Sequence, residues 1–201
     1  ILGGMHVSLL PEEAALHADA IYTGDAEFLW GQVIADAMRG ELRPRYQARG
    51  GSPQPGFITR RELFKGKGYL PLSLVQFSRG CRFGCEFCAV SAYFGAQHHC
   101  RAIEETIREI ESQERRHIFF VDDNLLADHQ RAKELFKALI PLELQWVSQG
   151  SIDMTDDPEL MELMVASGCL GHVIGFESIN PENLSQMGKS PNLSGGSDNY
   201  A

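Results

Sequence analysis

Three cysteines, Cys81, Cys85 and Cys88, lie within eight residues of one another near the middle of the chain. Their C-x3-C-x2-C spacing could hold one metal centre, because thiolates bind both zinc and iron–sulfur clusters. A structural zinc site needs four ligands, commonly as two separated CxxC pairs, and bacterial ferredoxins space their first three cysteines C-x2-C-x2-C with a fourth downstream. Neither pattern is met. The spacing favours a cubane iron–sulfur cluster with three protein ligands and one iron open to a small molecule.

Two more cysteines, Cys100 and Cys169, lie outside this group. Cys169 is interpreted as a buried small hydrophobe, and Cys100 is a less favoured alternative as a fourth ligand. The adjacent His98 and His99 are interpreted as loop surface, because neighbouring side chains rarely face the same metal. Five cysteines with three in one group do not form a disulfide framework, so they indicate a reducing compartment, hence the cytoplasm.

The three cysteines, with aromatic Phe87 directly before the last of them, resemble the motif of the radical S-adenosylmethionine (SAM) enzymes. The resemblance implies that Cys81, Cys85 and Cys88 ligate a [4Fe–4S] cluster, and that the amino and carboxylate groups of SAM chelate its fourth iron. It also implies that an electron from the cluster cleaves SAM to methionine and a 5′-deoxyadenosyl radical. Phe87 would pack against the cluster or the adenine, with ordinary core packing as the alternative. The electrons would come from a low-potential partner such as a flavodoxin or ferredoxin, and the substrate is an unknown small molecule.

The segments around the cysteines alternate between strand and helix patterns. Strands are predicted at 72–77, 117–121, 144–148 and 172–176, and helices over about 103–114, after a cap at Asp128 and after a cap at Asp157. Repeated β-then-α units predict parallel strands with right-handed crossovers, as in a βα-barrel, whose sites lie at the carboxyl ends of the strands. Since the resemblance implies a partial barrel, often of six units, residues 72–201 are predicted to be the first half of a radical SAM barrel.

Polar side chains follow three of these predicted strands: Asp122 and Asp123 the second, Gln149 the third and Glu177 the fourth. The resemblance places the "FVDDN" aspartates near the amino end of SAM, and the acid of "GFES" near bound SAM; Gln149 is a further candidate. The alternatives are a capping pair that only closes the turn and a carboxylate satisfied within the barrel end.

Residues 1–40 are predicted to be the last part of an α/β domain, with a helix opening at Pro11, a short strand at 20–22 and a helix over about 27–38. The segment 41–71 is predicted to be a linker, because glycine and proline interrupt it at 50–56. Its arginines and lysines are interpreted as solvated charges, with a phosphate-bearing ligand as the alternative.

The Gly3-Gly4 turn and the "YTGDAEF" stretch resemble the end of the Rossmann-like cobalamin-binding domain that precedes many radical SAM domains. The resemblance implies that the backbone at Gly3 and Gly4 lies against the nucleotide tail of cobalamin. The cobalt-coordinating motif of that family is not found in the sequence, and His6 and His17 do not fit it. The alternative is a Rossmann-like half with another ligand or none.

Composition limits the remaining possibilities. The 201 residues are 43% hydrophobic, enough for one or two packed domains, and a net charge of −9 does not favour nucleic acid as a partner. No run of about 18 apolar residues predicts a membrane span. The chain does not start with methionine and ends in a polar stretch, so it is interpreted as part of a longer protein.

The sequence thus predicts a radical SAM enzyme, associated with cobalamin, that starts radical chemistry on an unknown substrate. Cobalamin beside SAM suggests methylation at an unreactive carbon or phosphorus, although ring-forming relatives share this architecture. One alternative is an iron–sulfur module for electron transfer or redox sensing, which would be expected to carry a fourth nearby cysteine and would need no barrel. Another is a zinc-binding interaction module, which a second CxxC pair would support.

Overall fold

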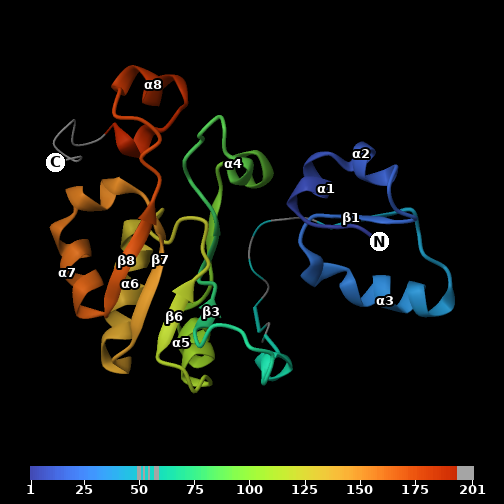
Figure 1. Cartoon of the computed structure of the whole chain (residues 1–201), viewed down its shortest axis with the longest axis horizontal. Coiled ribbons are helices and arrows are strands. Elements are labelled where there is room, and N and C mark those ends of the chain that lie inside the picture. The colour runs from blue at the N-terminus through green and yellow to red at the C-terminus, as the bar shows by residue number, and fades with distance from the viewer. Residues whose placement is uncertain (49–50, 52, 54, 57–58, 194–201) are drawn as a thin grey trace.

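The computed structural model describes residues 1–48, 51, 53, 55–56 and 59–193. Part of the stretch predicted to break regular structure, 50–56, lies outside the described residues. Figure 1 shows two α/β units beside each other, a small one formed by the N-terminal residues and a larger one built on a parallel sheet.

The small unit has two short parallel strands with helices on either side. Its elements are α1 (Met5–Leu9), α2 (Pro11–Ala15), β1 (Ile21–Thr23), a 3-10 turn (Ala26–Phe28), α3 (Trp30–Arg39) and β2 (Arg45–Gln47). β1 pairs with β2, and Leu2 forms a parallel bridge to Ile21 on the other side. The helix at Pro11 and the strand at β1 were predicted. β2 lies within the segment predicted to be a linker, and its three residues are too few to produce a hydrophobic period.

The larger unit is a four-stranded parallel sheet in the order β3-β6-β7-β8. Its strands are β3 (Ser73–Val75), β6 (His117–Phe120), β7 (Gln145–Gly150) and β8 (Cys169–Ile174), and the helices after β3, β6 and β7 are α5 (Ile103–Glu111), α6 (His129–Leu139) and α7 (Pro158–Ala166). A short helix, α8 (Pro181–Gln186), follows β8. The order of strands along the sheet is their order in the chain, as repeated β-then-α units require. The predicted α/β class with parallel strands is therefore confirmed.

The helices pack on one face of this sheet. The buried Trp146 of β7 stacks on Phe136 of α6, with 4.9 Å between ring centroids, and meets Phe120 of β6 edge-on at 5.7 Å. Asp128 and Asp157 cap α6 and α7 by accepting hydrogen bonds from the N–H groups three residues ahead, at 3.0 and 3.1 Å. Both caps were predicted. Because β6 and β7 are parallel, their carboxyl ends lie at the same edge of the sheet.

Two short paired strands enclose the cysteine loop in the chain, one before it and one after it. β4 (Ser78–Gly80) pairs antiparallel with β5 (His98–Cys100), and α4 (Ala89–Phe94) lies between them. The interpretation of His98 and His99 as loop surface was therefore wrong, because both residues lie in β5. Gly80 has φ +82°, and a Cβ there would lie 2.3 Å from a backbone oxygen, so only glycine fits this close strand pair.

The fourth strand of the parallel sheet starts earlier than predicted, at Cys169 instead of His172. Gly168 turns the chain with φ +90°, and a Cβ there would lie 1.9 Å from the carbonyl oxygen of Leu144. The chain thus enters β8 directly from the end of α7. Cys169 is a half-buried strand residue that packs at the margin of the core.

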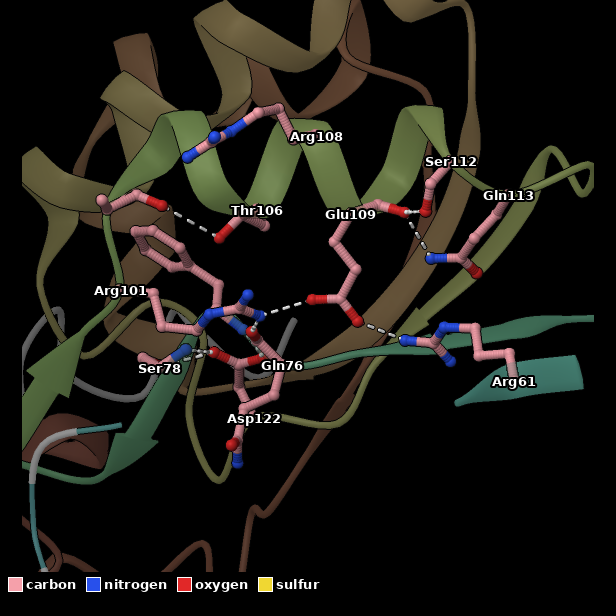
Figure 2. A network of polar contacts seen from close by, with 12 residues as sticks. Arg61, Gln76, Ser78, Arg101, Thr106, Arg108, Glu109, Ser112, Gln113 and Asp122 are labelled. Atoms are coloured by element: carbon pink, nitrogen blue, oxygen red, sulfur yellow. Dashed lines mark hydrogen bonds and ion pairs between the residues drawn. The ribbon is translucent and has the colours of Figure 1, made fainter. Parts of the chain in front are cut away.

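A buried carboxylate ties the predicted linker to the sheet. Figure 2 shows Glu109 of α5, whose two carboxylate oxygens form ion pairs with Arg61 and Arg101, one with each. Arg101 also donates to the carbonyl oxygen of Gln76 at 2.7 Å, just before the chain enters β4. Arg61, interpreted from the sequence as a solvated charge, is instead paired. The network holds the strand end that leads to the cysteines.

No helix in the described part of the chain is long and apolar enough to cross a bilayer. The longest, α6, has 11 residues, whereas a transmembrane helix needs about 20.

Candidate active site

The three cysteines lie on the loop between β4 and α4, where the parallel strands end. Cys85 is buried, with 8% of its surface exposed, and Cys81 and Cys88 are half-buried. None of the five cysteines, all of them described residues, forms a disulfide. Cys88 directly precedes α4 and donates its N–H to the carbonyl oxygen of Cys85 at 3.1 Å, while Glu86 donates its N–H to the carbonyl oxygen of Met187 at 3.0 Å. The loop is therefore held both by its own helix and by the segment after α8.

The donor set fits the predicted [4Fe–4S] cluster. Within the described residues, no three Cys, His, Asp or Glu side chains gather around a position for one metal ion. Three cysteine thiolates on one loop supply ligands of the kind that hold iron–sulfur clusters. Burial raises the pKa of the Cys81 and Cys85 thiols, so metal binding would release their protons.

Asp122 is fully buried at the end of β6. Its carboxylate accepts the N–H of Phe77 at 3.1 Å, the N–H of Ser78 and the hydroxyl of Ser78 at 2.5 Å (Figure 2). Both oxygens are therefore directed at the junction of β3 and β4, three residues before Cys81. In this position Asp122 can hold the strand that carries the cysteine loop, and it presents no exposed surface.

Burial raises the pKa of Asp122 from 3.8 to about 6, against the lowering effect of its hydrogen bonds from Ser78 and Phe77. The folded state therefore binds a proton between about pH 4 and pH 6 that the unfolded state has released, so stability falls as the pH rises through this window. We expect the free energy of unfolding of the wild type, minus that of Asp122→Asn, to decrease by about 2 kcal/mol from pH 4 to pH 7. Urea denaturation at a series of pH values measures it.

Asp122→Ala is the matched variant for this experiment, because it also removes the titrating group but differs from Asp122→Asn in its remaining hydrogen bonds. The two variants should differ from each other by an amount that does not change between pH 4 and pH 7. A wild type whose stability follows that of both variants across this range would contradict the shifted pKa.

A first cavity of about 500 Å³ lies between the two units. Gly3 and Gly4 line it from the small unit, and Gln76, Arg79 and Asp123 line it from the larger one. One oxygen of Asp123 accepts the N–H of Gly80 at 2.9 Å, next to the first cysteine. Three residues predicted to contact cofactors, Gly3, Gly4 and Asp123, are thus brought to one cavity.

A second cavity, of about 530 Å³, lies beside the cysteine loop and is lined by Phe87 and Glu177 among others. Glu177 has φ +60° and accepts a hydrogen bond from Lys189 at 3.2 Å. The Lys189 ammonium lies 5.8 Å from the centre of the Phe87 ring. Gln149 lines neither of these two cavities, and its side-chain N–H donates to the carbonyl oxygen of Asp122 at 3.4 Å.

Arg79, two residues before Cys81, joins the two units. Its guanidinium donates to Asp25 at 3.0 Å and to Glu27 at 2.7 Å, and Tyr93 donates to the other oxygen of Asp25 at 3.1 Å. The side chains of Arg79, Asp25 and Glu27 are only 15%, 10% and 17% exposed. A partly buried ion-pair network therefore fixes the small unit against the strand that enters the cysteine loop.

Sequence reasoning missed two groups of residues here. Asp25 and Glu27 were part of a quoted stretch but were not assigned a role, because their partner lies more than 50 residues away. Asn124, which donates to the sulfur of Cys81 at 3.7 Å, directly follows the two predicted aspartates. Its place at a strand end beside them was the available signal.

Comparison with known proteins agrees with this arrangement. The family model of the radical SAM superfamily matches residues 75–194, which include the cysteine loop and the parallel strands β6, β7 and β8. The chain belongs to the radical SAM superfamily. The cysteines, the β-then-α order and the strand-end acids are the features that this radical SAM chain displays.

Relatives and solved structures extend over both units of the radical SAM chain. It is 30% identical to the bacteriochlorophyllide d C-12(1)-methyltransferase of Chlorobaculum tepidum, over 96% of this chain and 44% of the relative. It is 28% identical to the hopanoid C-2 methylase of Rhodopseudomonas palustris, over 96% of this chain and 39% of the relative. The chain spans about half the length, or less, of these curated relatives.

The structure of the radical SAM methyltransferase TsrM from Kitasatospora setae, with cobalamin and a [4Fe-4S] cluster bound, has the same fold over 98% of this chain and 46% of that one. The TM-score is 0.71 at 17% sequence identity. The likeness therefore includes the small N-terminal unit as well as the parallel sheet.

Proposed function

We propose that this chain belongs to a cobalamin-dependent radical SAM methyltransferase. The observation that carries the proposal is the position of the cysteine loop, which lies at the carboxyl ends of the parallel strands and next to the cavity lined by Gly3, Gly4 and Asp123. The names of the relatives support methyl transfer as the reaction class.

Cys81, Cys85 and Cys88 would hold a [4Fe–4S] cluster. When bound, the cluster supplies the electron that cleaves SAM, and cobalamin supplies a carrier for the methyl group. The role of the protein is to bind and orient the cluster, SAM and cobalamin. Asp122 and the Arg101–Glu109 pair hold the strand end before the cysteine loop. Helix α4, which begins directly after Cys88, holds the other end of the loop.

SAM would occupy the region between the cysteine loop and the strand ends. Asp123 has one oxygen bound to Gly80, so the other is available to an ammonium group. Phe87 and Glu177 lie on the second cavity, where an aromatic face and a carboxylate suit an adenosine. Gln149, one strand further along the sheet, would act on this region through its hydrogen bond to the carbonyl oxygen of Asp122.

Cobalamin would lie against the small unit. Gly4 opens α1 with φ +105°, a conformation that side chains rarely adopt, and both glycines face the first cavity without side chains. A backbone exposed in this way allows close approach of a large cofactor. The TsrM structure, which has the same fold, contains bound cobalamin.

The substrate class is an unreactive carbon on a small molecule, by analogy with relatives named for a bacteriochlorophyllide and a hopanoid. The enzyme would work in the reducing cytoplasm, where thiolates stay available. A flavodoxin or ferredoxin would supply its electrons.

The experiment that tests the proposal is anaerobic reconstitution with iron and sulfide, followed by EPR of the dithionite-reduced chain with and without SAM. We expect a [4Fe–4S]⁺ signal whose g values change when SAM is added, because SAM binds the open iron. A cluster signal that ignores SAM would instead identify an electron-transfer or sensing module. Tetrahedral zinc in place of iron would identify a zinc-binding module, and either result would overturn the proposal.

A separate measurement tests the cobalamin part. Equilibrium dialysis with hydroxocobalamin should show binding by the wild type and weaker binding by Gly4→Val, whose side chain would enter the first cavity and strain the turn. Equal binding by both would contradict the role of this turn.

A further inference from the structure

Asn124, the residue after the two strand-end aspartates, lies in contact with the first cysteine. Its amide nitrogen is 3.7 Å from the sulfur of Cys81 and 3.0 Å from the hydroxyl oxygen of Ser151. The amide oxygen accepts the N–H of Leu126 at 3.1 Å. The amide nitrogen and oxygen are thus both engaged, and the side chain is buried.

These partners decide which way the amide is oriented. A backbone N–H can only donate, so the atom that faces Leu126 must be the oxygen of the amide. The nitrogen must then face Cys81 and Ser151, with one N–H for each. The direction of the hydrogen bond to sulfur therefore follows from the backbone contact and does not depend on the placement of hydrogen atoms.

The donor is also held rigidly. Leu125 and Leu126 are completely buried in the main core, and Ser151 is buried at the end of β7. Next to Cys81, the Arg82 guanidinium lies 3.7 Å from the buried carboxylate of Asp153, in the 3-10 turn that follows Ser151. Two neighbouring strand ends therefore hold the beginning of the cysteine loop, and the amide cannot turn away without breaking several buried contacts.

A cysteine sulfur bound to a cluster becomes more negative when the cluster is reduced, so an N–H donor stabilises the reduced form more than the oxidised form. Hydrogen bonds to the sulfurs are among the factors that set the potentials of iron–sulfur clusters. We propose that Asn124 is a positioning residue that donates a hydrogen bond to the Cys81 sulfur and raises the reduction potential of the cluster, so that a biological donor can reduce the cluster more readily. This inference rests on the proposed function, since it requires the cluster.

The test is an EPR-monitored redox titration of the reconstituted chain, without SAM, in the wild type and three variants. Asn124→Leu removes the donor without adding charge. Asn124→Asp keeps an oxygen for the Leu126 N–H but places a carboxylate beside the sulfur, and it serves if the leucine variant does not fold. Ser151→Ala is the matched control, because it removes the other partner of the same amide nitrogen and leaves the contact with Cys81.

We expect Asn124→Leu to shift the midpoint to more negative potential, by a change of about tenfold in the ratio of reduced to oxidised cluster, which is about 59 mV for one electron. Asn124→Asp should shift it further in the same direction, and Ser151→Ala should leave it at the wild-type value. Iron content and circular dichroism establish that each variant is folded and loaded.

Wild-type midpoints in both Asn124 variants, with full cluster content, would overturn the inference and leave the proposed function intact. A shift in Ser151→Ala as large as that in Asn124→Leu would also overturn it, because the effect would then come from general disturbance of the strand end. A wild type that binds no [4Fe–4S] cluster would overturn the proposed function itself, and this inference with it.

Discussion

Replacing Cys85 by alanine is expected to lower the iron bound after reconstitution at least tenfold and to abolish the [4Fe–4S]⁺ EPR signal. Cys85 is the most buried of the three loop cysteines, and a direct ligand cannot be replaced by the solvent that is excluded there. Loss of a residue that only orients a metal ligand already costs about 10–100-fold in metal affinity, so loss of the ligand itself should cost more. Iron and sulfide analysis with EPR measures the result.

Cys100→Ala and Cys169→Ala are the matched controls. Burial raises the pKa of Cys100 to about 11, its sulfur is 3.8 Å from the Nδ1 atom of His98, and Cys169 lies at the start of β8. Both variants should keep the full iron content and the response to SAM. A cluster lost in Cys100→Ala would show that Cys100 closes the fourth iron, and it would contradict an open site for SAM. Circular dichroism should stay unchanged in Cys85→Ala, because the substitution removes a single sulfur atom.

The features that the sequence predicts correctly are those with a long or strongly spaced pattern. The β-then-α order after residue 72 follows from helices of nine to eleven residues with apolar faces, and from caps such as Asp128 and Asp157. The cysteine spacing is sufficient to identify the family. The hairpin of β4 and β5 is different, because three-residue strands such as Ser78–Gly80 have no period and depend on a partner about 20 residues away.

In the candidate site, too, some features could be predicted from the sequence and others could not. That polar residues would gather at the strand ends is a consequence of parallel topology, and Asp123 and Glu177 do lie on cavities there. What each side chain contacts could not be predicted, because adjacent residues point in different directions: Asp122 binds the β3–β4 junction, Asp123 binds Gly80 and Asn124 binds Cys81. The cofactor roles of the strand-end residues therefore stay predictions. For Asp122, the contacts with the β3–β4 junction indicate a role in holding the cysteine loop.

The second large effect is expected from Arg79→Gln, which should lower the free energy of unfolding by about 2–4 kcal/mol. The substitution leaves the carboxylates of Asp25 and Glu27 without their cation in a place where little solvent reaches them. Removing one member of a buried pair costs about 3–5 kcal/mol, and the remaining exposure of these groups reduces that figure. Urea denaturation near pH 7 measures the change.

Arg45→Gln is the control for Arg79→Gln, because Arg45 also pairs with a carboxylate, Glu12, but the two side chains are 52% and 80% exposed. Loss of such an exposed pair should lower the free energy of unfolding far less than Arg79→Gln does, and salt should reduce the effect further. The double variant of Arg79→Gln with Glu27→Gln should be less destabilised than the sum of its single changes, because the second substitution removes a carboxylate that the first has left unpaired.

If Arg79→Gln cost no more than Arg45→Gln, the small unit would have to be held against the cysteine loop by other contacts. The expected coupling would instead support a role for Arg79, two residues before the first proposed cluster ligand, in holding the small unit against the strand that enters the cysteine loop.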